Sequence, residues 1–420
     1  MEHRARSAEQ ESTKRRAGEK CIRLALLIGS ILLCHSGLAY SQVSRVHPAI
    51  SSAALGIRLG ELRIHPAFSL TEEYESNVFQ TPTNEQGDFI TRISPGFALH
   101  LPLGRHDFYT GYRAEFLKYI RLKNQDTTDH YATTGMKLDF PGGLLVNMDN
   151  AFIKSNEAPL SDLTGPVKNR RDALATNVEY RLAELYSIGL NHNLNYYDYL
   201  EQQDEFLDRI ENRVGLAGYY RIFPKTDALV EPGYGRIDYL QSSSTNRNAN
   251  NYDFLVGLRG EPTARLRGFT KLGVMFREPT RSGGENWSGF VTFNQLNYQM
   301  TAKTSFTLTF ERRPFESSFT NNDFFISLFG ILTMNYLFSP ALSFQVNVGS
   351  ALNEYPVTAT VGTQTAKRDD TLVGAGAGVI YTFNRWLFVR ANYQYDRRNS
   401  NFNIFDFNDH RASISINLAL

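Results

Sequence analysis

The chain ends on a segment, residues 410–420, in which apolar and polar residues alternate almost without a break. Its apolar face holds Ile414, Ile416, Leu418 and Leu420. A period of two is typical of a β-strand with one apolar face. Water-soluble proteins cover or blunt such edge strands, whereas a closed membrane barrel pairs its last strand with its first. We therefore interpret this segment as the closing strand of a membrane barrel, with a half-buried strand of a soluble sandwich as the alternative.

From about residue 64 onward, similar alternating segments are joined by connections whose lengths also alternate. Short turns are expected at residues 101–105, 140–143, 182–185, 223–227, 261–265, 301–304, 338–341 and 383–385. Longer polar loops are expected between them, among them residues 155–171, 240–251, 278–286 and 353–370. Tight turns in the periplasm and long loops outside the cell are typical of bacterial outer-membrane barrels. The prediction is an all-β fold: a transmembrane, antiparallel, up-and-down β-barrel of about 18 strands (about 16–18).

Aromatic residues make up 13% of the chain, and many lie near the predicted strand ends. In a barrel such residues form girdles at the two membrane interfaces. The candidates are Phe140, Phe223, Tyr239, Phe338, Phe383, Trp386 and Tyr395. One segment, residues 324–338, is apolar on both faces. We expect its inner face to contact a plug or an inward-folded loop.

The first residues have the pattern of a secretory signal. Several Lys and Arg residues precede an apolar run from Leu24 to Cys34, which is shorter than the roughly 20 residues of a membrane-spanning helix. Small residues follow, and we predict cleavage after Ala39 or Ser41. The expected organisation is a signal peptide at residues 1–41, a periplasmic N-terminal tail at 42–61 and an outer-membrane barrel at 62–420.

Cysteine usage and charge exclude several classes of function. Both cysteines, Cys21 and Cys34, fall inside the predicted signal, so the mature chain would have no disulfide and no thiolate chemistry. The formal net charge is +1, and nothing resembles the basic stripe of a nucleic-acid-binding protein.

Residues near both ends of the predicted barrel are similar to those of a known family. The first set is Gly60, Leu62, Arg63, Pro66, Leu70, Tyr74, Asn77, Val78, Asp88, Phe89, Ile90, Pro95, Gly96, Gly104, Arg105, His106, Tyr112, Ala114, Glu115 and Tyr119. The second set is Tyr395, Arg398, Ser400, Asn401, Phe402, Asp406 and Phe407. With these residues the chain resembles the outer-membrane family called putative beta-barrel porin 2. The resemblance implies a link to exopolysaccharide synthesis loci, and it supplies no catalytic motif.

Charged residues recur on the strand faces opposite the apolar ones. Charges facing hydrocarbon are very costly, so we expect these faces to line a water-filled lumen. The candidate lumen-lining residues are Tyr109, Arg113, Glu115, Tyr131, Lys137, Asp139, Glu179, Arg181, Glu211, Arg213, Tyr219, Arg259, Arg277 and Arg390. Both signs of charge occur, which favours a polar cavity without strong ion selectivity; structural pairing inside the lumen explains them equally well. The three tyrosines, set near arginines, are candidates to stack on sugar rings.

No catalytic, cofactor or metal site is expected, and we predict that the protein is not an enzyme. The acidic run of Asp198, Glu201, Asp204, Glu205, Asp208 and Glu211 has two readings, a divalent-cation site and a solvated loop. His130 and His192 would be the histidines of a Ser-His-Asn hydrolase, but neither lies in a recognisable catalytic arrangement.

Together these patterns predict a porin-like channel in the bacterial outer membrane, for passive passage of hydrophilic solutes or export of a polysaccharide. One alternative is a plugged structural or adhesive barrel that acts through its extracellular loops. Another is an outer-membrane lipid hydrolase. The expected partners are outer-membrane lipids, the barrel assembly machinery and, for export, a polysaccharide or periplasmic export components, with no nucleic acid.

Overall fold

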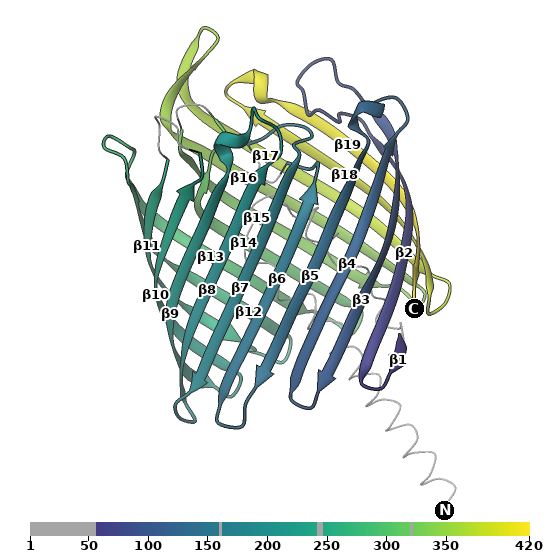
Figure 1. The fold of residues 1–420 in the computed structure, drawn as a ribbon, viewed down its shortest axis with the longest axis vertical. Coiled ribbons are helices and arrows are strands. Elements are labelled where there is room, and N and C mark those ends of the chain that lie inside the picture. The colour runs from purple at the N-terminus through teal and green to yellow at the C-terminus, as the bar shows by residue number, and fades with distance from the viewer. Residues whose placement is uncertain (1–55, 159–161, 242–246, 320–321) are drawn as a thin grey trace, which may run out of the picture.

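The barrel is one closed antiparallel sheet in which each strand pairs with the next along the chain (Figure 1). The computed structural model describes residues 56–158, 162–241, 247–319 and 322–420. A short strand, β1 (Ile57–Leu59), pairs with the first barrel strand. The eighteen barrel strands are β2 (Leu62–Glu75), β3 (Asp88–Leu103), β4 (His106–Tyr119), β5 (Thr127–Asp139), β6 (Leu144–Ser155), β7 (Asn169–Arg181), β8 (Tyr186–Tyr199), β9 (Arg209–Phe223), β10 (Thr226–Tyr239), β11 (Ala249–Gly260), β12 (Leu266–Pro279), β13 (Trp287–Gln299), β14 (Thr304–Glu316), β15 (Phe324–Leu337), β16 (Leu342–Val361), β17 (Gln364–Thr382), β18 (Leu387–Ser400) and β19 (Phe407–Ala419). The 3-10 helices η1 (Lys123–Gln125), η2 (Glu205–Leu207) and η3 (Asn403–Phe405) lie in connections. The predicted barrel and its strand number are confirmed.

The barrel closes between β19 and β2. Ile416 lies opposite Leu70, and Leu418 lies opposite Phe68. The seam extends to the last residue, because the Leu420 N–H donates to the Pro66 carbonyl at 3.1 Å. No backbone edge is left open along these strands, as a bilayer requires.

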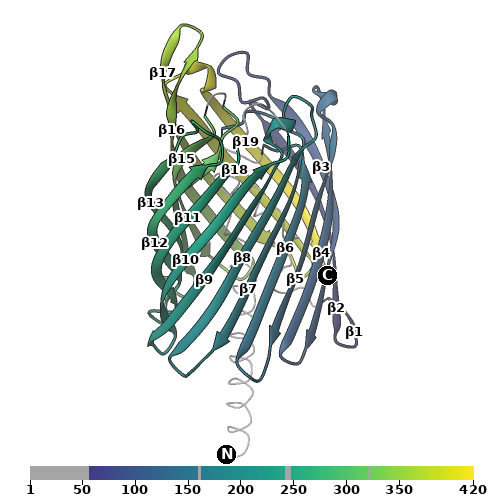
Figure 2. The same ribbon diagram turned by 60° about the vertical axis from the view of Figure 1, so that its left-hand side comes forward.

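Apart from the tip of the β16–β17 hairpin, the short turns lie at one end of the barrel and the longer connections lie at the other, as Figures 1 and 2 show. The β3–β4 and β9–β10 turns each consist of two residues, and in the first of them Gly104 adopts a φ of +62°. Glycine adopts this positive φ without strain.

The prediction of a long loop at residues 353–370 is wrong. Strands β16 and β17 continue through it and are joined by only two residues, Gly362 and Thr363. The hairpin therefore rises above the other connections (Figure 1). Polar residues in this stretch suggested a loop, but outside the bilayer a strand can be polar on both faces because water solvates both.

The outer face of the wall is apolar. Leu190, Val214, Phe254, Val274 and Ile416 are among the many exposed apolar side chains, and all fall on the face opposite the inward charges by strand alternation. Among the described residues, no helix is long and apolar enough to cross a membrane.

Most of the predicted girdle lies where it was expected at the short-turn end. Phe140, Phe223, Phe338 and Trp386 are exposed beside the short turns. The prediction for Tyr239 is wrong, because its hydroxyl donates to Glu316 on the inner side of the barrel, at 2.8 Å. Strand alternation carries Tyr239 inward, and the sequence alone does not reveal the carboxylate that binds it.

The predicted signal peptide lies outside the described residues, and so does most of the predicted tail. The end of the tail region forms β1, which turns back through Gly60 onto β2.

Candidate functional site

The inner face of the barrel carries charged side chains that form separate buried clusters. The first cluster joins β2, β3 and β4. Arg92 bonds Glu73 at 2.7 Å and Glu115 at 3.0 Å, and Glu157 of the β6–β7 connection lies 3.9 Å away. Arg113 approaches Glu115 at 3.4 Å and covers the ring of Tyr131. Two arginines thus face three carboxylates within a few ångströms, so this cluster has one more acidic than basic side chain.

A second cluster joins β9, β10, β11 and β12. Arg213 binds both Glu231, at 2.8 Å, and Asp253, at 2.6 Å. Lys271 bonds the other oxygen of Glu231 at 2.7 Å. The carboxylates of Glu231 and Asp253 are almost completely buried, and such groups are stable only when they are paired.

A third cluster lies nearer the short turns. Arg259 bonds Glu179 at 2.8 Å and Asp227 at 3.0 Å, and its guanidinium lies 3.4 Å from the centroid of the Tyr219 ring. The ring face is therefore occupied by a cation. It is not free for a sugar in this arrangement.

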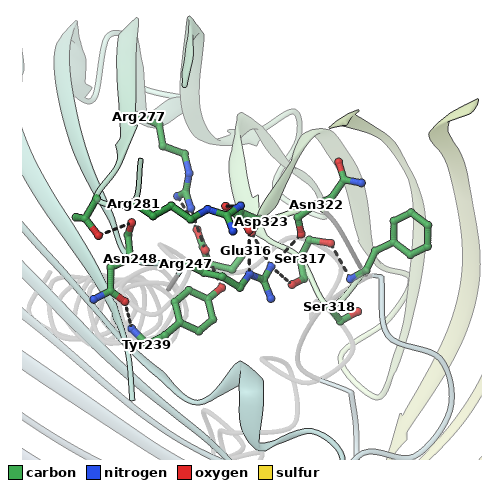
Figure 3. A network of polar contacts seen from close by, with 12 residues as sticks. Tyr239, Arg247, Asn248, Arg277, Arg281, Glu316, Ser317, Ser318, Asn322 and Asp323 are labelled. Carbon is green, nitrogen blue, oxygen red and sulfur yellow. Dashed lines mark hydrogen bonds and ion pairs between the residues drawn. The ribbon is translucent and has the colours of Figure 1, made fainter. Parts of the chain in front are cut away.

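The β14–β15 connection is held by arginines from neighbouring connections (Figure 3). Arg247 donates to the carbonyls of Ser317, Asn322 and Asp323. Arg281 bonds the Asp323 carboxylate at 2.7 Å. These charge-assisted hydrogen bonds from arginine fix the backbone of the β14–β15 connection.

Strand ends below this connection add a buried pair. Arg277 bonds Glu316 through both guanidinium nitrogens, at 2.6 and 3.1 Å. Tyr239 donates to the same carboxylate. This bidentate geometry fixes the position of the end of β14.

The β6–β7 connection (residues 156–168) reaches this same region. The carboxylate of Asp162 accepts the Ser317 hydroxyl at 3.0 Å and the Ser318 N–H at 2.6 Å. In the sheet order, β6 and β7 lie about half the circumference away from β14 and β15. The contact therefore extends across the mouth of the barrel.

The strand predicted to be apolar on both faces, β15, does contact an inward connection. Phe325 packs with Phe315 and Tyr355, and Phe319 of the β14–β15 connection packs against that group. Farther along, Phe329 and Ile331 pack with neighbouring strands. Of these side chains, Phe329 and Ile331 line the cavity inside the barrel.

A cavity of about 1030 Å³ lies inside the barrel. On one side it is lined by the first charged cluster and by the β6–β7 connection. On the opposite side, beside apolar residues such as Phe329 and charged residues such as Asp396 and Arg411, its lining includes many amides and hydroxyls, namely Gln295, Asn297, Thr307, Thr333, Asn335, Gln345, Asn347, Asn392, Gln394, Ser413, Ser415 and Asn417. A smaller cavity of about 100 Å³ adjoins the second cluster.

Three glycines of β17 make the amide side possible. Gly374, Gly376 and Gly378 face the lumen, and Gly374 and Gly378 line the cavity. A Cβ on Gly376 would lie 2.2 Å from the Gln394 Oε1, and one on Gly378 would lie 2.5 Å from the Asn392 Oδ1. Amide side chains therefore lie across bare backbone, where a larger residue would displace them.

The remaining predicted lumen residues are distributed along the wall. Tyr109 donates to Asp149, Asp139 bonds Arg105 at 3.1 Å, and Glu211 bonds Arg209 at 2.8 Å. By strand alternation Lys137 and Arg181 point inward near the short turns. Only some of the predicted residues, Arg113, Glu115, Tyr131, Arg213, Glu179, Tyr219 and Arg259, fall within the three clusters.

Sequence reasoning missed several strand residues that complete the clusters and the Arg277 pair. These are Glu73, Arg92, Asp227, Glu231, Asp253 and Lys271 in the clusters, and Glu316 in the pair. Each shares a face with other inward residues, so a complete strand-by-strand assignment of faces would have found them. Asp162 carries no comparable signal, because its partners lie in a distant connection.

The acidic run predicted as a cation site or a solvated loop is divided among separate partners. Asp198 bonds Arg170, and Glu201 bonds Lys168. Asp208 accepts the Tyr199 N–H at 2.7 Å, although burial raises the pKa of its carboxyl. Within the described part of the chain, no three His, Cys, Asp or Glu side chains are grouped to hold a metal ion.

The histidines considered for hydrolysis lie on the outer face. His130 bonds the Tyr112 hydroxyl at 2.8 Å, and His192 bonds Asn212 at 3.0 Å. In these pairs the rings bond a tyrosine hydroxyl and an asparagine amide, and not the serine hydroxyl that the predicted hydrolase arrangement would pair with histidine.

A closed eighteen-strand barrel with an apolar exterior and a polar, water-accessible interior defines a porin-like outer-membrane β-barrel channel. The chain belongs to the family described as "Putative beta-barrel porin 2", whose model matches residues 51–420. The location in the outer membrane and the lipid contacts of its outer face follow from this membership and fold.

Solved structures that resemble the chain include outer-membrane proteins of Pseudomonas. The BenF-like porin from Pseudomonas fluorescens Pf-5 is 10% identical, with a TM-score of 0.45 over 85% of this chain and 99% of that one. The outer membrane protein opdK from Pseudomonas aeruginosa is 12% identical, with a TM-score of 0.43 over 85% and 99%. OprD from the same species is 10% identical, with a TM-score of 0.42 over 87% and 95%. No curated protein matches the sequence.

Proposed function

We propose that this channel conducts small hydrophilic solutes passively and catalyses no reaction. The observation that carries the proposal is the cavity of about 1030 Å³ with its amide and hydroxyl lining. Such a lining exchanges hydrogen bonds with a solute in place of water, and many weak contacts permit release. Paired charges around it contribute a polar environment without a strong net preference for one ion.

The reach of the β6–β7 connection favours small solutes over a polymer. Asp162 binds the opposite connection, and Leu163, Gly165 and Pro166 line the cavity. A polysaccharide chain would have to displace these contacts to pass. We therefore place polysaccharide export, with its periplasmic export components, second to solute passage.

The same contact also favours the alternative of a plugged barrel that acts through its outer connections. Residues from the β6–β7, β10–β11, β12–β13 and β14–β15 connections are joined by hydrogen bonds over one part of the mouth. In that alternative the network is permanent and the lumen does not conduct.

Single-channel recording separates these functions. The full-length precursor would be expressed in a Gram-negative host, and the processed protein would be purified from the outer membrane and inserted into a planar bilayer. Steady, weakly selective current steps are the expected result. Silence from protein that shows β-type circular dichroism and heat-modifiable migration would refute solute passage and support the plugged barrel. Insertion into the outer membrane by the barrel assembly machinery is part of the proposal, and depletion of that machinery should abolish the heat-modifiable form.

A further inference from the structure

One inward arginine of the large cavity differs from those in the clusters. Arg390 of β18 lines the cavity and lies between Ile380 of β17 and Ser415 of β19. Among the described residues, no carboxylate lies within 4.0 Å of it, whereas Arg92, Arg213 and Arg259 each bind at least two. Its Nε is buried without a hydrogen-bond partner in the same described set.

The surroundings of Arg390 are neutral and rich in hydrogen-bonding groups. Asn392 is the next inward residue on the same strand, and Ser415 and Asn417 are inward on β19. Asn417 already donates to the Ser415 hydroxyl at 3.0 Å, which orients that pair. Gly378 leaves the space over which the Asn392 amide lies. The wall thus combines one cation with several donors and acceptors.

An unpaired guanidinium in a partly dehydrated site is costly unless an anion completes it. Its planar donors match the two oxygens of a carboxylate. The amides and hydroxyl beside it match the hydroxyl groups of a polar solute. A single positive charge is balanced by a monoanion, whereas a doubly charged phosphate would leave one charge uncompensated.

We propose that Arg390, with Asn392, Ser415 and Asn417, forms a binding subsite for the carboxylate of a hydroxyl-rich solute of the sugar-acid class. The inference rests on the proposed passage of small hydrophilic solutes and names one class among them. It assigns to Arg390 a ligand-binding role that the paired arginines do not have.

Isothermal titration calorimetry on the folded barrel in detergent tests the subsite without requiring conduction. The titrants are glucuronate, its uncharged methyl ester and inorganic phosphate. Wild-type protein should bind glucuronate about ten- to a hundredfold more tightly than the ester, because a charge-assisted hydrogen-bond pair is lost in the ester. Equal binding of acid and ester, or tighter binding of phosphate than of glucuronate, would overturn the proposal.

Two variants locate the effect. Arg390→Gln should remove the preference for the acid, so that glucuronate and its methyl ester bind with similar affinity. Lys137→Gln, which removes another inward cation outside the cavity lining, should retain the preference. A preference that survives Arg390→Gln would refute the assignment. If Arg390→Gln does not fold, the acid-against-ester comparison on wild-type protein still decides whether a carboxylate is recognised. Current recordings report separately on conduction, so a silent barrel that still prefers glucuronate would contradict the proposed function but not the subsite.

Discussion

The contact of Asp162 with the opposite side of the mouth leads to the most direct prediction. Asp162 is only 4% exposed, and its carboxylate accepts two hydrogen bonds, from the Ser317 hydroxyl and the Ser318 N–H. A hydrogen bond to a charged group contributes about 1.5–3 kcal/mol. Taking the lower value for each of the two hydrogen bonds that Asp162→Ala removes gives about 3 kcal/mol for the pair.

A loss of about 3 kcal/mol corresponds to a roughly hundredfold larger population in which the two connections are separated. In planar-bilayer recordings of Asp162→Ala, we expect a higher-conductance level whose occupancy rises by about that factor relative to wild type. Asp126→Ala is the matched control. Asp126 also accepts a backbone N–H, from Tyr119, and it bonds Lys118, but these partners belong to its own hairpin.

The folding of each variant would be checked by heat-modifiable migration. Folded Asp162→Ala protein with the same current levels and occupancies as wild type would refute the idea that this contact restricts the lumen. The idea would also be refuted if Asp126→Ala changed the current as much as Asp162→Ala does.

Three further perturbations test the lumen and the wall. Arg213→Ala leaves two buried carboxylates without this partner, so urea unfolding in lipid should show a loss of about 3–5 kcal/mol; an unchanged midpoint would contradict the importance of the cluster. Ile416→Arg places a charge on the lipid face and should cost about 2–4 kcal/mol, whereas Ser413→Arg on the lumen face of the same strand should cost much less. Equal losses for these two variants would contradict the assigned faces. Gly376→Leu should displace the Gln394 amide and lower the unitary conductance of a folded barrel, and wild-type conductance would show that the amides do not narrow the path.

The alternation of side chains was enough to predict the wall of the barrel. A period of two assigns each residue to the lipid or the lumen, and short turns at regular intervals give the number of strands. It also placed Arg213 and Arg259 inward. It failed at residues 353–370, because polarity on both faces was taken as the mark of a loop.

The partners inside the lumen could not be predicted in the same way. Arg213 meets Asp253 two strands away, and such a contact depends on strand register, which the period of two does not determine. Asp162 meets Ser317 across the mouth, which depends on the path of a connection with no periodicity at all. Strand faces are local properties of sequence, whereas these contacts are set by the closed barrel as a whole.

The seam between β2 and β19 has a consequence for the order of folding. Every other pair of adjacent barrel strands is joined by a hairpin, but His65 and Leu420, which meet at the seam, are 355 positions apart. Bringing such distant segments together costs about 5 kcal/mol of chain entropy by the logarithmic loop-closure relation. Hairpins can therefore form early and in any order, whereas circular closure has to come late and is the step most dependent on outside assistance. Until it occurs, the nascent sheet exposes two unpaired edges, and these are where it is most vulnerable to misassembly.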